Sequence, residues 1–298
     1  MLQRTLHLPS PIDVAATVRA ARRGEHDATL RIGSDGVWRA SRAPGGPATV
    51  HLVQAGRELT ATAWGDGAEA ALDAVPGLVG ALDDTSGFAP EHPLVARIWH
   101  EHGTLRLPTT GAVVETLVNV VLEQRVTTYE ARRAQAQLVE RWGEPAPGPT
   151  DLRLPPDPEV LAAVAYYDLH VIGVERKRAD TVRRVAANAR QLEPLRDLPR
   201  AAARARLEQV PGIGPWTAAE VALVALGDAD AVPVGDVHLP SIITYALTGT
   251  SVNEDDAMLE ALEPFAGHRG RVIRLVQAAG IAPARQAPRY APRDVRGQ

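Results

Sequence analysis

The spacing of apolar residues changes about one third of the way along the 298-residue chain. Up to about residue 90, short segments alternate apolar and polar side chains or are rich in β-branched residues, a pattern typical of strands. Glycine-containing turns separate them. The predicted strands are 4–8, 28–32, 36–41, 48–54 and 58–64. Two helices are predicted in the same part, at 11–23 and 67–82.

Beyond residue 91 the period becomes helical. Apolar residues at three- and four-residue spacings predict amphipathic helices over 111–124 and 128–142. The Pro-rich stretch 144–158 is predicted to be a surface loop. We see no internal repeat. The remaining predicted helices lie near 158–168, 177–192 and 200–209, followed by a helical hairpin and three more helices.

These patterns predict a fold class and three parts. Residues 1–90 form an α+β module in which helices pack on an antiparallel sheet. Residues 91–280 form a mainly α-helical region, and residues 281–298 a Pro- and Arg-rich tail. The chain is 45% hydrophobic and 23% charged, as in ordinary globular proteins. The sequence has no apolar run long enough to span a membrane and no apolar block typical of a signal peptide. We therefore expect the protein to be cytoplasmic. If DNA is its partner, we expect it to be associated with the bacterial nucleoid.

Two residue types are scarce, and this limits the chemistry. Cysteine is absent, which excludes disulfides, zinc–thiolate sites and iron–sulfur clusters. Lys177 is the only lysine, so 31 of the 32 basic residues are arginine. A mechanism that needs a lysine amine therefore has one candidate. The histidines of "HEHG" (100–103) lack further ligands in the sequence and are predicted to be surface residues.

The distribution of charge leaves the partner open. A net charge of −4 argues against a nucleic acid. Basic residues are nevertheless concentrated in two stretches: 175–190 holds six against two acids, and 268–298 holds seven against one. Either stretch could contact DNA or form a solvated helix face. The same two alternatives, a contact with the DNA backbone or an ordinary surface position, stay open for Arg269 and Arg271 in the second stretch.

The sequence "LEQVPGIGPWTAAEV" (207–221) predicts two helices joined by a tight turn. Pro211 ends the first helix, because proline disfavours the α conformation in the residue before it. Gly212 and Gly214 permit positive φ and close backbone approach. Pro215 suits the first position of the next helix.

This turn has the elements of an anion site. The amides of Trp216, Thr217 and Ala218 would lack intrahelical partners at the positive end of the helix dipole. A phosphate could approach them, because no side chain in the turn is larger than Ile213. The alternative is a plain structural joint between two helices.

One acid follows the turn at a fixed spacing. Asp236 lies 20 positions after Trp216, inside "VGDVHLP", at the predicted start of a helix over 237–248. As the N-cap, its carboxylate would accept hydrogen bonds from the first amides. A carboxylate that faces the turn could also take part in chemistry.

The pattern L-x-x-V-P-G-I-G-x-W-T-A followed by Asp236 resembles the helix-hairpin-helix signature of the DNA glycosylase superfamily. The resemblance implies that double-stranded DNA with a damaged base is the partner of a monomeric enzyme. It implies that the turn grips one strand and that Asp236 is the catalytic residue. It also allows a monovalent cation on carbonyls near Val210 and Gly212, with no other cofactor. The implied DNA-binding residues of the turn are Pro211, Gly212, Ile213, Gly214 and Thr217.

The resemblance is to the DNA-3-methyladenine glycosylase II type, which removes alkylated bases without cutting the backbone. Trp216 occupies the position where strand-cutting members carry a Schiff-base lysine. Trp216 is then the stacking surface for a flipped base, or else a core residue that braces the hairpin. One carboxylate suffices for an alkylated base, because a cationic leaving group needs no proton; a neutral base would need a second acid, and Asp228 and Asp230 look like loop residues.

A second match lies in "LVNVVLEQRVTTYEA" (117–131). It places Gln124 on a family glutamine that meets DNA, and Arg125 on the wedge that fills the gap left by the flipped base. An arginine there departs from the often apolar wedge, and it could either stack in the gap as a planar cation or contact a phosphate. The pocket is poor in aromatic residues. Three other functions stay open: a non-catalytic protein that recognises DNA structure, a glycosylase for deaminated or oxidised bases, and an enzyme with lyase activity.

Overall fold

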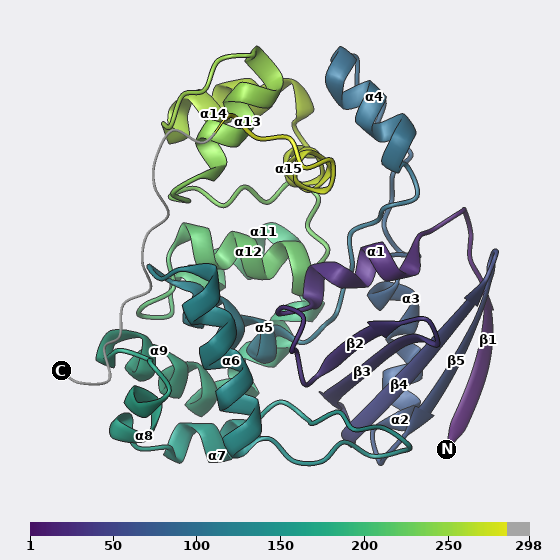
Figure 1. Cartoon of the computed structure of the whole chain (residues 1–298), viewed down its shortest axis with the longest axis vertical. Coiled ribbons are helices and arrows are strands. Elements are labelled where there is room, and N and C mark those ends of the chain that lie inside the picture. The colour runs from purple at the N-terminus through teal and green to yellow at the C-terminus, as the bar shows by residue number, and fades with distance from the viewer. Residues whose placement is uncertain (285–298) are drawn as a thin grey trace.

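A computed structural model gives the structure of the chain, and it describes residues 1–284 (Figure 1). The predicted fold class is confirmed: a five-stranded antiparallel sheet forms the N-terminal part and helices form the rest. Most of the tail predicted at 281–298 lies outside the described residues. No helix within residues 1–284 has the length and apolar character needed to cross a membrane.

The sheet has the strand order β1-β5-β4-β3-β2 with every pair antiparallel. All five predicted strands are present, as β1 (Leu2–His7), β2 (Leu30–Gly33), β3 (Gly36–Ala43), β4 (Gly46–Ala55) and β5 (Glu58–Trp64). Neighbouring residues of a strand point to opposite faces, so Val37 and Trp38 enter different cores. The face of Val37 is covered by α1 (Val14–Val18), α2 (Ala68–Asp73) and α3 (Val75–Leu78).

The opposite face of the sheet is covered by the stretch 144–158, which was predicted to be a surface loop. Trp38 and Trp64 stack there with ring centroids 5.6 Å apart, and Leu152 and Leu154 pack beside them. The backbone amide of Arg153 also donates to the carbonyl of Ala28, next to β2. The stretch is therefore not a plain surface loop, because its apolar side chains cover a sheet face that the helices leave bare.

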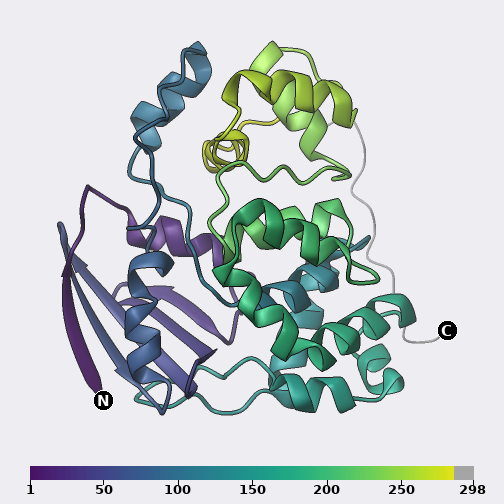
Figure 2. The same cartoon turned by 180° about the vertical axis from the view of Figure 1, so that it is seen from behind.

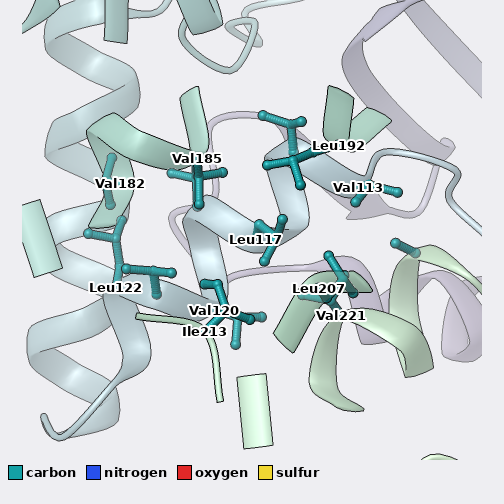
Figure 3. Close-up of a cluster of buried hydrophobic side chains, with 14 of the residues drawn as sticks. Val113, Leu117, Val120, Leu122, Val182, Val185, Leu192, Leu207, Ile213 and Val221 are labelled. Atoms are coloured by element: carbon teal, nitrogen blue, oxygen red, sulfur yellow. The ribbon is translucent and has the colours of Figure 1, made fainter. Parts of the chain in front are cut away.

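The helices form two lobes with separate cores (Figures 1 and 2). We call the larger one the hairpin lobe; Figure 3 shows its core, with Leu117 and Leu122 of α5 among the buried side chains. Its helices are α5 (Val113–Glu123), α6 (Thr128–Trp142), α7 (Pro158–Ala163), α8 (Tyr166–Val171), α9 (Arg176–Ala187), α10 (Ala189–Leu192), α11 (Arg200–Glu208) and α12 (Pro215–Ala225). The helix predicted over 158–168 is two helices, because the backbone at Val164 is extended (ψ 130°).

The smaller terminal lobe combines a helix from the middle of the chain with the last three. It contains α4 (Pro93–His102), α13 (Leu239–Thr248), α14 (Asp255–Leu262) and α15 (Arg269–Ala278). Ile98 of α4 packs with Ile243, Met258 and Val276 in its core. The chain thus crosses between the lobes after α4 and again after α12, and the second crossing carries Asp236.

A buried ion pair ties the terminal lobe to the N-terminal module. Arg271 is 2% exposed, and its two terminal nitrogens lie 2.7 and 2.8 Å from the carboxylate oxygens of Asp83. The guanidinium also lies over the ring of Phe88, 5.7 Å from its centroid. The prediction that Arg271 is a surface or DNA-contacting residue is therefore wrong, because its guanidinium is buried and paired with Asp83.

Candidate active site and nucleic-acid interface

The turn between α11 and α12 depends on one glycine for its shape and on another for its open surface. Gly212 has a φ of +96°, and a Cβ atom there would lie 2.4 Å from Oγ1 of Thr181. Gly214 has a φ of −105°, which other residues also adopt, so the prediction of positive φ holds for Gly212 alone. A Cβ on Gly214 would meet nothing within 4 Å. Gly214 therefore keeps the outer surface of the turn free for a ligand.

The turn was predicted to leave the amides of Trp216, Thr217 and Ala218 without acceptors, and the structure differs from this at one residue. The amide of Ala218 donates to the carbonyl of Gly214 at 3.0 Å, so it is not available. The amides of Gly214, Trp216 and Thr217 have no acceptor in the part of the chain that the structure describes. They lie at the N-terminal end of α12, where the helix dipole is positive. The backbone thus has the donor arrangement that suits a phosphate.

Two side chains of the turn face inward, so a DNA contact by Ile213 or Thr217 would have to come from the backbone, and both contacts stay predictions. Ile213 is 5% exposed and packs in the core of the hairpin lobe (Figure 3). Thr217 is 2% exposed, and its hydroxyl oxygen accepts a hydrogen bond from Nε2 of Gln124. Both side chains anchor the turn, while Pro211 and Gly212 remain exposed.

Gln124 braces the hairpin from the end of α5. Its Nε2 donates to the carbonyl of Gly212 at 3.1 Å and to Thr217 at 2.9 Å. Its amide nitrogen is therefore occupied within the protein, and only its amide oxygen is left for the predicted DNA contact. The sequence match found the residue but not this packing role.

The predicted cation would bind the carbonyl oxygens of Val210 and Gly212. Each already accepts one hydrogen bond, from the amide of Ile213 and from Gln124 respectively. A carbonyl oxygen has two lone pairs, so both can still bind a monovalent cation. The cation remains a prediction.

Arg125 follows Gln124 in a strained backbone conformation. Its φ of +56° makes it the only residue other than glycine with positive φ among those described, and its side chain is exposed. A left-handed conformation costs an L-residue about 1–2 kcal/mol. Such outliers persist mainly where the surroundings impose them, often at functional sites. The wedge role of Arg125 stays a prediction that this geometry favours.

Both carboxylate oxygens of Asp236 have fixed partners. Oδ1 accepts hydrogen bonds from the amides of His238 and Leu239, each at 2.8 Å. Oδ2 accepts one from Nε1 of Trp216 at 3.0 Å, and this bond joins the start of α12 to the start of α13. Asp236 is half-buried, so the carboxylate is neither sealed in the core nor free in solvent. The predicted N-cap position is wrong by two residues: α13 begins at Leu239 and its N-cap is His238, so Asp236 binds the amides of His238 and Leu239 from just before the helix.

A contact behind Asp236 escaped the sequence analysis. The amide of Gly235 donates to both carboxylate oxygens of Asp255, each at 3.1 Å. Asp255 is the first residue of α14, so the terminal lobe holds the loop that carries Asp236. The acidic residues of "NEDD" (253–256) suit the positive end of a helix dipole, but their sequence does not show which group Asp255 binds.

Asp228 and Asp230, the acids nearest to Asp236 in sequence, each lie beside an arginine away from the turn. Burial raises the pKa of Asp230, but hydrogen bonds and charge from Arg269 outweigh it and hold the pKa below its ordinary value. Arg269 is therefore a structural partner rather than a free surface residue. Asp228 is 4% exposed and lies 3.3 Å from Nε of Arg204. Within residues 1–284, no group of three or more His, Asp or Glu side chains could hold a metal ion.

Comparison with curated proteins finds relatives that match part of the chain, and no protein-family model matches it. The probable bifunctional transcriptional activator/DNA repair enzyme AlkA of Mycobacterium tuberculosis is 32% identical over 138 residues, which are 45% of this chain and 27% of that protein. The putative DNA-3-methyladenine glycosylase YfjP of Bacillus subtilis is 26% identical over 153 residues, which are 50% of this chain and 52% of that protein. The chain therefore spans about half or less of the length of these relatives.

Comparison with solved structures covers nearly the whole chain. The 3-methyladenine DNA glycosylase of Archaeoglobus fulgidus superposes with a TM-score of 0.77 at 17% identity, over 92% of this chain and 97% of that one. The fold is that of the helix-hairpin-helix DNA glycosylases. The 8-oxoguanine glycosylase/lyase of Clostridium acetobutylicum, bound to double-stranded DNA, has the same fold with a TM-score of 0.68 at 13% identity, over 91% of this chain and 93% of that one.

In this helix-hairpin-helix glycosylase fold, the contribution of the Trp216–Asp236 hydrogen bond can be measured by substitution. Trp216→Phe keeps a large ring in place but removes the N–H that holds Oδ2. A hydrogen bond to a charged group contributes about 1.5–3 kcal/mol, so any reaction step that depends on the Asp236 carboxylate is expected to slow by about ten- to a hundredfold. If that step is glycosylase chemistry, single-turnover rates with saturating DNA measure it. A full rate in a Trp216→Phe variant that binds its substrate normally would contradict the role.

Proposed function

We propose that the protein is a monofunctional DNA glycosylase that flips an alkylated base of the 3-methyladenine type out of the duplex and hydrolyses its N-glycosidic bond. The sequence likeness to AlkA and to a putative 3-methyladenine glycosylase supports the substrate class. The observation that carries the proposal is Asp236, whose carboxylate is fixed at both oxygens beside the DNA-binding turn.

The chemistry requires a fixed negative charge. As the N-glycosidic bond breaks, its electron pair leaves with the base and positive charge develops on the deoxyribose. The Asp236 carboxylate stabilises that charge and orients the attacking water, whose proton it accepts as the new C–O bond forms. The products are the free base and an abasic site. The hydrogen bonds to Trp216, His238 and Leu239 hold the carboxylate in place, so little reorganisation is needed during the reaction.

DNA binding would use backbone groups on the turn and side chains beside it. The amides of Gly214, Trp216 and Thr217 bind phosphate oxygens of one strand. The carbonyl oxygens of Val210 and Gly212 would hold a monovalent cation, which would add positive charge beside the phosphate. Arg125 enters the duplex where the damaged base has left, as a planar cation that can stack. Trp216 contributes its ring face to the base pocket in addition to positioning Asp236.

The proposal includes the absence of strand cleavage through a Schiff base. Trp216 occupies the hairpin position of the nucleophilic lysine, and the chain has only Lys177. Borohydride added to the reaction with an abasic duplex is therefore expected to trap no covalent adduct. A trapped complex that disappears in Lys177→Ala would identify the enzyme as a lyase.

The function is tested with randomly methylated duplex DNA. We expect free methylated purines, identified by mass, and an equal number of abasic sites. Binding without release of any base would favour a DNA-structure recognition protein. Release from duplexes with deaminated or oxidised bases, but not from methylated DNA, would move the substrate class to neutral bases.

Substitutions at the two glycines of the turn should separate binding from folding. In Gly214→Ala the new methyl meets no protein atom within 4 Å, so the fold persists, but the methyl group stands on the surface that a strand must approach. We expect a loss of DNA affinity of about tenfold with an unchanged melting temperature. Gly212→Ala is the matched contrast, because positive φ and the contact with Thr181 make it destabilising as well. Equal affinity of Gly214→Ala and wild type would contradict the proposed interface.

A further inference from the structure

The hairpin between α11 and α12 has a second copy in the chain, which corrects the prediction of no internal repeat. Residues 171–186 (VIGVERKRADTVRRVA) align without a gap on 210–225 (VPGIGPWTAAEVALVA). Six positions are identical: Val, Gly, Ala, Val, Val and Ala recur in that order at the same places, 39 residues apart. The first copy connects α8 to α9 in the hairpin lobe (Figure 1).

The backbone geometry repeats along with the sequence. Gly173 has a φ of +88° and Gly212 a φ of +96°. Val174 is fully buried at the position of Ile213, which is 5% exposed. The carbonyl of each glycine accepts a hydrogen bond from a side chain at 3.1 Å, from Arg178 in the first copy and Gln124 in the second.

The exposed residues of the two copies differ in charge. Where the second copy has Gly214, Pro215 and Trp216, the first has Glu175, Arg176 and Lys177. All three side chains of the first copy are exposed. Arg176 pairs with Asp180 at 3.8 Å, and Glu175 lies 3.9 Å from Arg178.

Helix α9 places Lys177 beside the turn proposed to bind DNA. Thr181 lies one turn further along α9 and borders Gly212, and Arg184 donates to the carbonyl of Pro211 at 2.8 Å. Residues four apart on a helix share a face, about 6 Å from each other. Lys177 therefore lies on the face of α9 that carries Thr181 and Arg184, and its exposed side chain is long and flexible.

We propose that the exposed start of α9 is a second DNA contact, in which Lys177 binds a backbone phosphate of the duplex held at the α11–α12 turn. The inference rests on the proposed function for its partner. Its own support is the positive side chain on the face shared with Thr181 and Arg184, which extends the proposed interface along α9. Glu175 opposes this contact, because its carboxylate lies two residues from the ammonium and repels the same phosphate.

The test measures duplex affinity against salt concentration for Lys177→Gln, Lys177→Arg and Glu175→Gln. A phosphate contact contributes about 0.9 to the slope of log affinity against log salt. We expect Lys177→Gln to weaken binding several-fold for every duplex sequence and to lower that slope by about 0.9, while Lys177→Arg retains both. Glu175→Gln should tighten binding, since it removes a negative charge and no capping hydrogen bond. Arg141→Gln, an exposed site at the far end of α6, is the control and should change neither.

The outcomes separate this inference from the function on which it rests. Wild-type protein that binds no duplex would overturn both. Wild-type binding with an unchanged affinity and slope in Lys177→Gln overturns the second contact alone. An equal loss in Arg141→Gln would also overturn it, because the effect would then report overall charge. Melting temperatures of all variants confirm that the fold is retained.

Discussion

Asp236→Asn is expected to slow base release by about a thousandfold while DNA affinity stays within about threefold of wild type. The amide has nearly the same shape as the carboxylate, and its oxygen can still accept hydrogen bonds from His238 and Leu239. The variant therefore keeps the start of α13 but lacks the negative charge that stabilises the cationic sugar. The loss should appear in the single-turnover rate at saturating DNA.

Asp256→Asn is the matched control for this experiment. It removes one negative charge from an exposed position in the first turn of α14, next to the residue that holds the Asp236 loop. We expect its rate to equal that of wild type. A single-turnover rate for Asp236→Asn within tenfold of wild type would refute the mechanism, whatever the affinity.

Breaking the Asp83–Arg271 pair is expected to be the most destabilising single change outside the apolar cores. Both side chains are nearly inaccessible, at 5% and 3% exposure. Asp83→Ala leaves an arginine charge buried without its partner, and removal of one member of a buried pair costs about 3–5 kcal/mol. For a chain of this size we expect the melting temperature to fall by about 6–20 °C, as measured by circular dichroism.

A double variant shows whether the cost comes from the unpaired charge. Asp83→Leu with Arg271→Leu removes both charges and fills the site with apolar atoms, so it should be more stable than either single variant. The exposed pair Arg4–Asp73 is the control, since such pairs contribute at most about 1 kcal/mol. A loss in Asp83→Ala no larger than in Arg4→Ala would show that the packing of the terminal lobe on the N-terminal module does not depend on this contact.

The features predicted correctly from sequence are those that depend on residues within a few positions of each other. The strands follow from alternating residues such as those of 58–64, because each side chain points to the core or to the other face. The hairpin follows from Pro211, Gly212 and Pro215, whose backbone preferences act within a few residues. Asp236 was singled out by its spacing, 20 residues after Trp216, which matches the family signature, and its catalytic role stays a prediction.

The features that were missed depend on residues distant in sequence. No local pattern indicates that Arg271 pairs with Asp83, 188 positions earlier, or that Gln124 bonds to the turn of the hairpin. Apolar side chains of the 144–158 loop are buried because they cover a sheet face that has no helix over it. The first copy of the hairpin was overlooked because Ile172, Glu175 and Arg176 replace the two prolines and the second glycine that made the other copy conspicuous.

The central claim is that the α11–α12 turn holds a strand so that the side chain at position 236 lies beside the deoxyribose. The most direct measurement is a crystal structure of Asp236→Asn bound to a duplex with an alkylated base. We expect phosphate oxygens about 3 Å from the amides of Gly214 and Trp216, and the sugar carbon that carries the base within about 4 Å of the residue 236 side chain. A duplex bound on another face, or a base still stacked with the side chain at 236 far from its sugar, would contradict the account.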